Sequence, residues 1–224
     1  MINLDLFDTE YFVFRKHVIR FDLLRNLKRL KVHSNSLIRS SSRLTSHLYR
    51  FEQLEQLDLQ FGLEENCDLL ISHPNLRTVS IHGFIYDDNE FDLDTEKLEV
   101  LRITDYFDSF YITHPSSIKH LTAPLSNLSG QSSKLTSFTN LEYFHVCCST
   151  TFDPIILTEL PKLKELKFVT EGDYCELIED ARDYSDVKQM IIGLIRMKQT
   201  LQREELKLYF GDVPLTGVKQ FKIF

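Results

Sequence analysis

A short pattern of apolar residues recurs along the chain, with three positions spaced as L-x-x-L-x-L. The fullest copy, at 27–37, reads L-K-R-L-K-V-H-S-N-S-L and places an asparagine at Asn35. Six further copies keep the three apolar positions: Leu54, Leu57 and Leu59; Leu76, Val79 and Ile81; Leu98, Leu101 and Ile103; Ile118, Leu121 and Ala123; Leu141, Phe144 and Val146; Leu163, Leu166 and Phe168. Apolar residues at every second position predict a short strand with one buried face in each copy.

The copies follow one another at a nearly constant interval. Their central residues lie 20 to 27 positions apart: Leu30, Leu57, Val79, Leu101, Leu121, Phe144 and Leu166. This interval and the form L-x-x-L-x-L-x-x-N-x-L are typical of leucine-rich repeats, whose units have about 20 to 29 residues. Weaker copies extend the array at both ends: Met1, Leu4 and Leu6; Leu206 and Leu208; Val218, Phe221 and Ile223. We therefore expect a single leucine-rich-repeat domain over 1–224, with about eight to ten irregular repeats.

The repeats predict an α/β solenoid, with a curved parallel sheet on the concave side and short helices and loops on the convex side. One unit cannot cover its apolar face alone, so neighbouring units stack and share a core. The connectors 67–72 and 155–160 are expected to form short helical turns that end before Pro74 and Pro161. Serine-rich segments around 40–42 and 129–133 are expected to be looser links.

The repeat is interrupted at 171–202. Residues 171–186 are rich in acids and contain Gly172, which predicts a solvated loop. From Val187 the apolar positions follow a 3.6-residue period, which predicts an amphipathic helix with Ser185 or Asp186 as N-cap. Two interpretations stay open for the helix: packing against its own repeat, or binding a partner. The acidic segment could bind cations or a basic partner, although it lacks the spacing of a calcium loop.

Composition narrows the function classes. The chain has 224 residues, 42% of them hydrophobic, and 33 acidic against 26 basic residues give a net charge of -7. Such a chain presents no basic field for nucleic acid or an anionic membrane, and no apolar run approaches the roughly 20 residues of a membrane helix. The four cysteines lack CxxC spacing, so reduced thiols and a cytoplasmic or nuclear location are expected.

Parts of the array resemble the irregular repeat region of F-box leucine-rich-repeat proteins. The residues that carry the resemblance are L-E-Q-L-D-L at 54–59, L-P-K-L-K-E-L-K-F at 160–168, and the ending L-K-L-Y-F-G-D-V-P-L at 206–215. The resemblance covers essentially the whole chain. It implies a repeat arc that holds a substrate, while an N-terminal F-box attaches the receptor to a cullin-RING ubiquitin ligase.

The start of the chain departs from that family's pattern. An F-box would be an apolar helical segment with Leu-Pro near its beginning, and Met1 to Phe21 contains no such segment. A strand-like copy also begins at Met1, although the terminal units of a solenoid need a polar cap. We therefore expect the chain to be the C-terminal part of a larger F-box product, or a relative that lost this segment. The resemblance would place attachment to a ubiquitin-ligase adaptor in a missing N-terminal segment. No residue of this chain is therefore assigned to that attachment.

The polar positions of successive strands are expected to form columns across the concave face, with neighbouring strands about 4.8 Å apart. Arginine and aromatic side chains often dominate protein interfaces, so this face is the expected site of a protein partner, the alternative being an ordinary solvated surface. The candidate contacts are Arg29, Lys31, His33, Asp58, His82, Arg102, His120, Tyr143, His145 and Lys167.

Other chemistry has weaker support in the sequence. His120, His145 and Cys147 lie on neighbouring predicted strands and carry zinc-ligand types, but their spacing matches no known metal motif. A hydrolase using Cys147 and His145 would need an orienting group and an oxyanion hole, for which the sequence gives no signal. We expect a protein without catalytic residues, metal or cofactor. It is either the substrate-binding arm of an F-box-type ubiquitin-ligase receptor or a free-standing repeat scaffold or inhibitor.

Overall fold

The computed structural model describes residues 2–6, 25–38, 48, 51–63, 69–82, 90–104, 109–124, 135–147, 153–169 and 181–216. The chain divides into two compact units, Met1–Ile118 and Lys119–Phe224, and each is described by itself. One domain over 1–224 stays a prediction. The apolar copy Val218, Phe221 and Ile223 and the serine-rich links at 40–42 and 129–133 lie outside the described residues.

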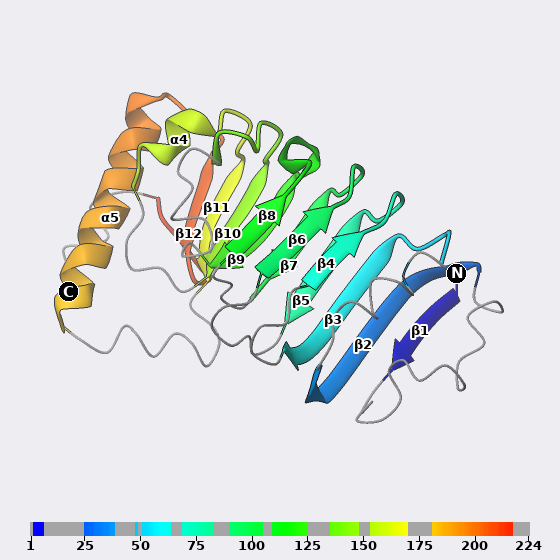
Figure 1. Ribbon diagram of the computed structural model, residues 1–224. Coiled ribbons are helices and arrows are strands. Elements are labelled where there is room, and N and C mark those ends of the chain that lie inside the picture. The colour runs from blue at the N-terminus through cyan, green and yellow to red at the C-terminus, as the bar shows by residue number, and fades with distance from the viewer. Residues whose placement is uncertain are drawn as a thin grey trace. The chain divides into compact units, whose positions relative to one another are not determined.

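The first unit contains a long parallel sheet (Figure 1). Its strands follow the order β1-β2-β3-β5-β7, and their bounds are Ile2–Leu6, Leu27–Ile38, Gln56–Leu63, Thr78–His82 and Val100–Ile103. Leu57 pairs with Val79, and Val79 pairs with Leu101, so each central residue meets the equivalent position of the next repeat. β1 pairs with β2 in the same manner, with Leu4 opposite Leu30, which confirms the weak copy at the start of the chain.

A second parallel sheet, of three strands, lies in the same unit. Its order is β4-β6-β8, with bounds Leu69–Ser72, Glu90–Asp94 and Ser109–Ile112. Each coil of the chain therefore adds one strand to each sheet, in the pairs β3 and β4, β5 and β6, and β7 and β8. A 3-10 turn, η2, follows at Pro115–Ser117. This arrangement is a solenoid built mostly from parallel strands.

The short helical turn expected at 67–72 was wrong, because Leu69–Ser72 is the strand β4. A short apolar run fits a helix or a strand equally well by periodicity. Here the parallel pairing with β6 favours a strand, since Ile71 lies opposite Leu93 and both side chains are buried. On this side of the first unit, the expected helices are replaced by a sheet.

The second unit has its own parallel strands in the order β9-β10-β11-β12. They span His120–Pro124, Tyr143–Cys147, Glu165–Val169 and Lys207–Phe210. The short strand β13, Val213–Pro214, pairs antiparallel with β12 and occupies its outer edge. Gly211 begins the tight turn between them with φ of 56°, a left-handed conformation that glycine adopts without a steric penalty.

The apolar positions of the repeat form the core. All three residues of each of the seven copies are buried, none of them more than 3% exposed, as are Leu206, just before β12, and Leu208 within it. In the first unit, Ile71, Phe91 and Leu93 of the second sheet are equally buried. The prediction of one buried face in each of the seven copies is therefore confirmed, and burial of Leu or Phe contributes roughly 1.5 to 3 kcal/mol per side chain.

In the part of the chain that the structure describes, α-helix is found mainly in two segments of the second unit. The helical turn expected near 155–160 is confirmed as α4, Ile156–Glu159. The long helix α5 spans Ala181–Thr200, so it begins before the expected Val187, and 181–186 belongs to the helix instead of an acidic loop. Apolar periodicity misses polar first turns, although acids there are favoured by the helix dipole. Residues 171–180 lie outside the described part.

α5 packs on the second unit through the apolar stripe that the sequence predicted. Met190, Ile191, Leu194 and Ile195 are buried, which supports packing over partner binding for these residues. Beyond α5, the guanidinium of Arg203 donates hydrogen bonds to the carbonyls of Leu157 (3.0 Å), Leu160 (2.9 Å) and Leu163. Burial lowers the pKa of Arg203. These carbonyls include groups at the end of α4 that the helix leaves without an internal partner.

Gly193 is expected to resist replacement by alanine. A Cβ atom there would lie 2.7 Å from Cγ of Pro154, a rigid ring atom beside α4. Alanine normally stabilises a helix interior by about 1 kcal/mol relative to glycine. We expect Gly193→Ala instead to lower the free energy of unfolding by about 1 to 3 kcal/mol, the usual cost of overpacking. Urea unfolding measures this, with Gln189→Ala, an exposed α5 position, as the control expected within about 0.5 kcal/mol of wild type. Equal stability of the two variants would refute the close contact.

Candidate functional site

The polar positions of the parallel strands align in columns, as predicted. In the first unit one row pairs Arg29, Gln56, Thr78 and Val100, the next pairs Lys31, Asp58, Ser80 and Arg102, and a third pairs His33, Gln60 and His82. In the second unit the rows are His120, Tyr143, Glu165 and Lys207, then Thr122, His145, Lys167 and Tyr209. We call these two sets of side chains the column face of each unit. Their core-facing neighbours in the strands are buried, so the columns point away from the core.

Several side chains on the first unit's column face hold one another across strands. Lys31 Nζ lies 3.7 Å from an Asp58 carboxylate oxygen. The Thr104 hydroxyl and Nδ1 of His82 are 3.3 Å apart. Arg102 is exposed and has no ion-pair partner among the residues that the structure describes. The Arg102 guanidinium is therefore an exposed cation on the same face as side chains that contact one another.

Two outward-facing strand positions, one in each unit, are buried instead of open. Ser80 is only 8% exposed, since the small side chain lies in the row between the longer Asp58 and Arg102. Pro124, opposite Cys147, is also buried. Neither side chain can offer much surface to a partner.

On the column face of the second unit, side chains of β9, β10 and β11 contact one another or a neighbouring residue. The rings of His120 and Tyr143 stack with centroids 4.3 Å apart and planes 8° apart. Nε2 of His145 lies 3.1 Å from a carboxylate oxygen of Glu165 on the next strand. Lys167 Nζ donates to the Asp212 carboxylate at 2.7 Å, and this hydrogen bond lowers the pKa of Asp212. Aromatic and charged groups are therefore pre-positioned by neighbours within the sheet.

The two histidines of the zinc hypothesis have separate partners. The His120 ring lies on Tyr143, whereas the His145 ring faces Glu165. Within the described residues, no three His, Cys, Asp or Glu side chains gather closely enough to hold a metal ion. The third group, the Cys147 thiol, belongs to a side chain outside the described part, so zinc binding and the Cys147–His145 hydrolase hypothesis stay untested.

A series of charged residues at the starts of the strands was not predicted from the sequence. The residue between the first two apolar positions of each copy, at or just before the start of the strand, alternates in charge: Lys28, Glu55, Arg77 and Glu99 in the first unit, and Lys119, Glu142 and Lys164 in the second. Ion pairs join Lys28 to Glu55 at 2.7 Å, Arg77 to Glu99 at 3.0 Å, and Lys164 to Glu142 at 2.7 Å. The signal was visible as alternating charge at one repeat position, a pattern that favours a single register of neighbouring strands.

The ion pairs of this series shift the ionisation of their members. A hydrogen bond from Lys28 lowers the pKa of Glu55, and one from Lys164 lowers the pKa of Glu142. The same bond raises the pKa of Lys164. Because these groups are exposed to solvent, the pairs contribute little to stability and act mainly on strand register.

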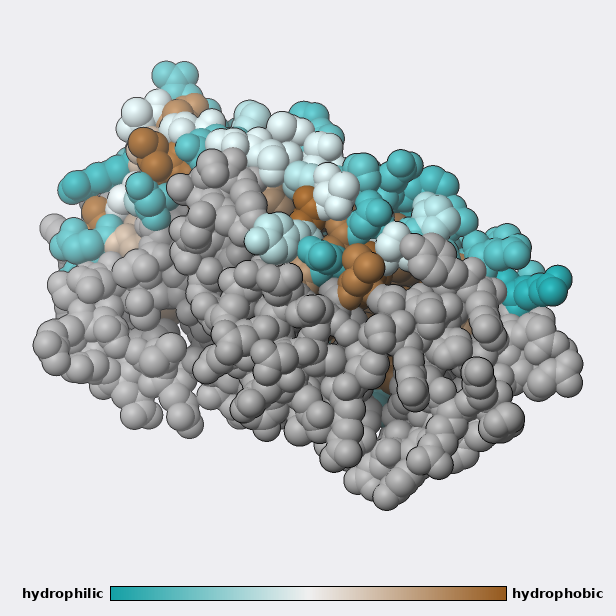
Figure 2. All heavy atoms as spheres, viewed as in Figure 1, coloured by the Kyte–Doolittle hydropathy of each residue, from teal (hydrophilic) through white to brown (hydrophobic). Residues whose placement is uncertain are grey.

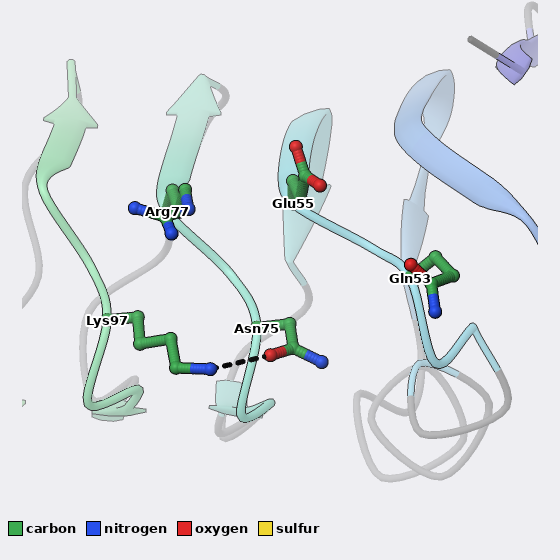
Figure 3. Close-up of a pocket in the computed structure, with 5 residues that line it drawn as sticks. All are labelled: Gln53, Glu55, Asn75, Arg77 and Lys97. Atoms are coloured by element: carbon green, nitrogen blue, oxygen red, sulfur yellow. Dashed lines mark hydrogen bonds between the residues drawn. The ribbon is translucent and has the colours of Figure 1, made fainter.

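The start of the strands in the first unit contains a polar hollow (Figure 3). Its lining comes from the segments leading into β3, β5 and β7: Gln53, Glu55, Asn75, Arg77 and Lys97. Lys97 Nζ donates to Oδ1 of Asn75 at 2.9 Å, and the Asn75 amide donates to the carbonyl of Glu52 at 3.0 Å. The ionic groups in the hollow are held by neighbours of the same unit.

His73, two residues before Asn75, is buried, and both of its ring nitrogens have hydrogen-bond partners. Nε2 donates to the Phe51 carbonyl at 3.1 Å, and Nδ1 accepts from the backbone N–H of Asn75 at 3.2 Å. Nδ1 can accept only when it carries no proton, so the geometry requires the neutral ring. Burial lowers the pKa of His73 in agreement with this geometry.

Comparisons with known proteins add no assignment. No protein-family model, curated protein or solved structure matches the chain. Among the helices of the described residues, none is long and apolar enough to span a membrane.

The burial of neutral His73 predicts a pH dependence of stability. Its folded pKa lies below the usual 6.5, so below pH 6.5 the unfolded chain binds a proton that the folded chain rejects. Stability is therefore full above this pH and falls as the pH drops towards the folded pKa, by at most about 1.4 kcal/mol per pH unit from this group. Urea unfolding between pH 7.5 and 5 should show a steeper loss in wild type than in His73→Gln, whose amide can still donate to Phe51. Parallel curves for the two proteins would show that His73 is not held neutral.

Proposed function

We propose that the chain is a non-catalytic protein-recognition module whose column faces bind a protein partner. The alignment of polar and aromatic side chains into rows on parallel strands carries this proposal. A broad sheet face of this kind offers many contact points at a fixed spacing of about 4.8 Å. It suits an extended protein surface better than a small molecule, which favours an enclosed concave pocket.

The ordering of these side chains supports the same proposal. Binding normally costs about 0.5 to 1.5 kcal/mol for each flexible side chain that becomes fixed. Tyr143 already stacks on His120, and His145 already meets Glu165, so less ordering is needed on contact. Arg102 adds an exposed guanidinium, a group that often anchors interfaces.

More specifically, we propose a leucine-rich-repeat receptor that acts as the substrate-binding arm of an F-box-type ubiquitin ligase in the cytoplasm or nucleus. The seven copies of L-x-x-L-x-L and the reduced-thiol composition support this assignment. The alternative is a free-standing scaffold or inhibitor. Only the column faces support this alternative, because such a protein acts by occupying its partner and needs no ubiquitin transfer.

Affinity capture from native extract tests the column faces. We expect wild type to retain partner proteins that Arg102→Ala or Tyr143→Ala retains at least about tenfold less, the effect of losing about 1.4 kcal/mol of binding. Arg196→Ala, an exposed change on α5, is the control and should retain them as wild type does. Circular dichroism and thermal unfolding establish that each variant is folded.

The same eluates separate the two functions. A cullin and its adaptor retained with the full-length gene product support the ligase receptor, and their reproducible absence supports the scaffold. If neither column variant changes any retained protein, the assignment of the partner site to the column faces is wrong.

A further inference from the structure

The second sheet of the first unit has an outer face of its own. Leu70 of β4 lies opposite Asp92 of β6, which lies opposite Tyr111 of β8. The intervening β6 side chains, Phe91 and Leu93, are buried, so Asp92 points away from the core. With strands about 4.8 Å apart, the row places a carboxylate between a leucine and a tyrosine over about 10 Å.

Both flanking side chains are unusually exposed. Leu70 is 47% and Tyr111 is 49% exposed, and they are two of the four exposed large hydrophobic residues in the described part of the chain. Figure 2 shows this face, where hydrophobic surface lies beside hydrophilic surface over β4, β6 and β8. Exposed apolar side chains that lie together beside polar groups are typical of interaction sites, whereas single exposed apolar residues occur on any protein surface.

Asp92 is exposed and has no ion-pair partner among the residues that the structure describes. Asp94, two residues further along β6, has polar neighbours. Nε2 of His114 lies 3.4 Å from one of its carboxylate oxygens, and the Ser72 hydroxyl lies 3.5 Å from the other. Both oxygens of Asp92 are therefore available to an incoming cation.

We propose that the row Leu70, Asp92 and Tyr111 is a docking site for an arginine-bearing, extended segment of another protein. A guanidinium can bind both oxygens of Asp92 at once, while its face stacks on the Tyr111 ring and its aliphatic stem covers Leu70. Lysine lacks the planar fork and would use the row less well. This site goes beyond the proposed function, because it lies on the second sheet and needs no residue of the column face.

The conformation of the partner follows from the strand. Side chains on one face of a strand repeat every two residues, about 6.8 Å apart, and this is the spacing of Asp92 and Asp94 along β6. An extended partner segment presents its own side chains at the same interval. Two arginines in alternate positions would thus reach both carboxylates, with Asp92 as the stronger acceptor.

A short synthetic peptide tests the site. The probe is acetyl-Thr-Arg-Thr-Arg-Thr-amide, titrated into the full chain by calorimetry, with the lysine version as a second probe. We expect the arginine peptide to bind wild type and to bind Asp92→Asn at least about tenfold more weakly. Glu204→Gln is the matched control, since it removes the same charge at an exposed position outside both proposed binding surfaces, and it should bind as wild type does. The lysine peptide should bind wild type more weakly than the arginine peptide.

Amide NMR spectra of the wild-type chain make the test independent of any variant. Addition of the arginine peptide should shift resonances of Leu70, Asp92 and Tyr111 more than those of Asp58 or Lys31. Absence of binding at millimolar peptide, equal weakening by Asp92→Asn and Glu204→Gln, or equal affinity for both peptides would each overturn the proposal. These outcomes leave the column-face assignment unaffected, because that assignment depends on Arg102 and Tyr143.

Discussion

The shared burial of apolar side chains between successive strands is the constraint on which the rest of the structure depends. Each strand offers only two or three apolar side chains to the interior, too few to stabilise an isolated unit. Residues such as Leu57, Val79 and Leu101 become buried only because they lie opposite one another in consecutive strands. A shift by one residue would expose every one of them.

That register also determines where the polar groups meet. Once Leu57 and Val79 are paired, Asp58 must lie opposite Ser80 and Glu55 must precede the strand beside Arg77. The backbone continues the same alignment ahead of the strands, where the Glu55 carbonyl accepts from the Arg77 amide at 2.8 Å. Column faces and the alternating charge series are thus consequences of one packing arrangement.

The sequence was most informative where this period of two operates. It predicted the parallel strands, the buried triplets and the alignment of the polar positions into columns, because these follow from alternation and repeat length. It failed at Leu69–Ser72, where four residues are too few to separate a helix from a strand, although the alternation of 90–94 was readable as a strand. The contacts of single side chains, such as Arg203 with three carbonyls or His73 with Phe51, depend on chain segments brought together by folding and leave no local pattern.

Cysteine cross-linking across β5 and β7 tests the register directly. Thr78 and Val100 are paired, about 4.8 Å apart, which suits a disulfide, whereas Thr78 and Arg102 are offset by two residues, about 8 Å, which does not. Mild oxidation should cross-link Thr78→Cys with Val100→Cys and leave Thr78→Cys with Arg102→Cys open, as mapped by mass spectrometry against the four native cysteines. Preferential cross-linking of the offset pair would contradict the shared-core register from which the columns follow.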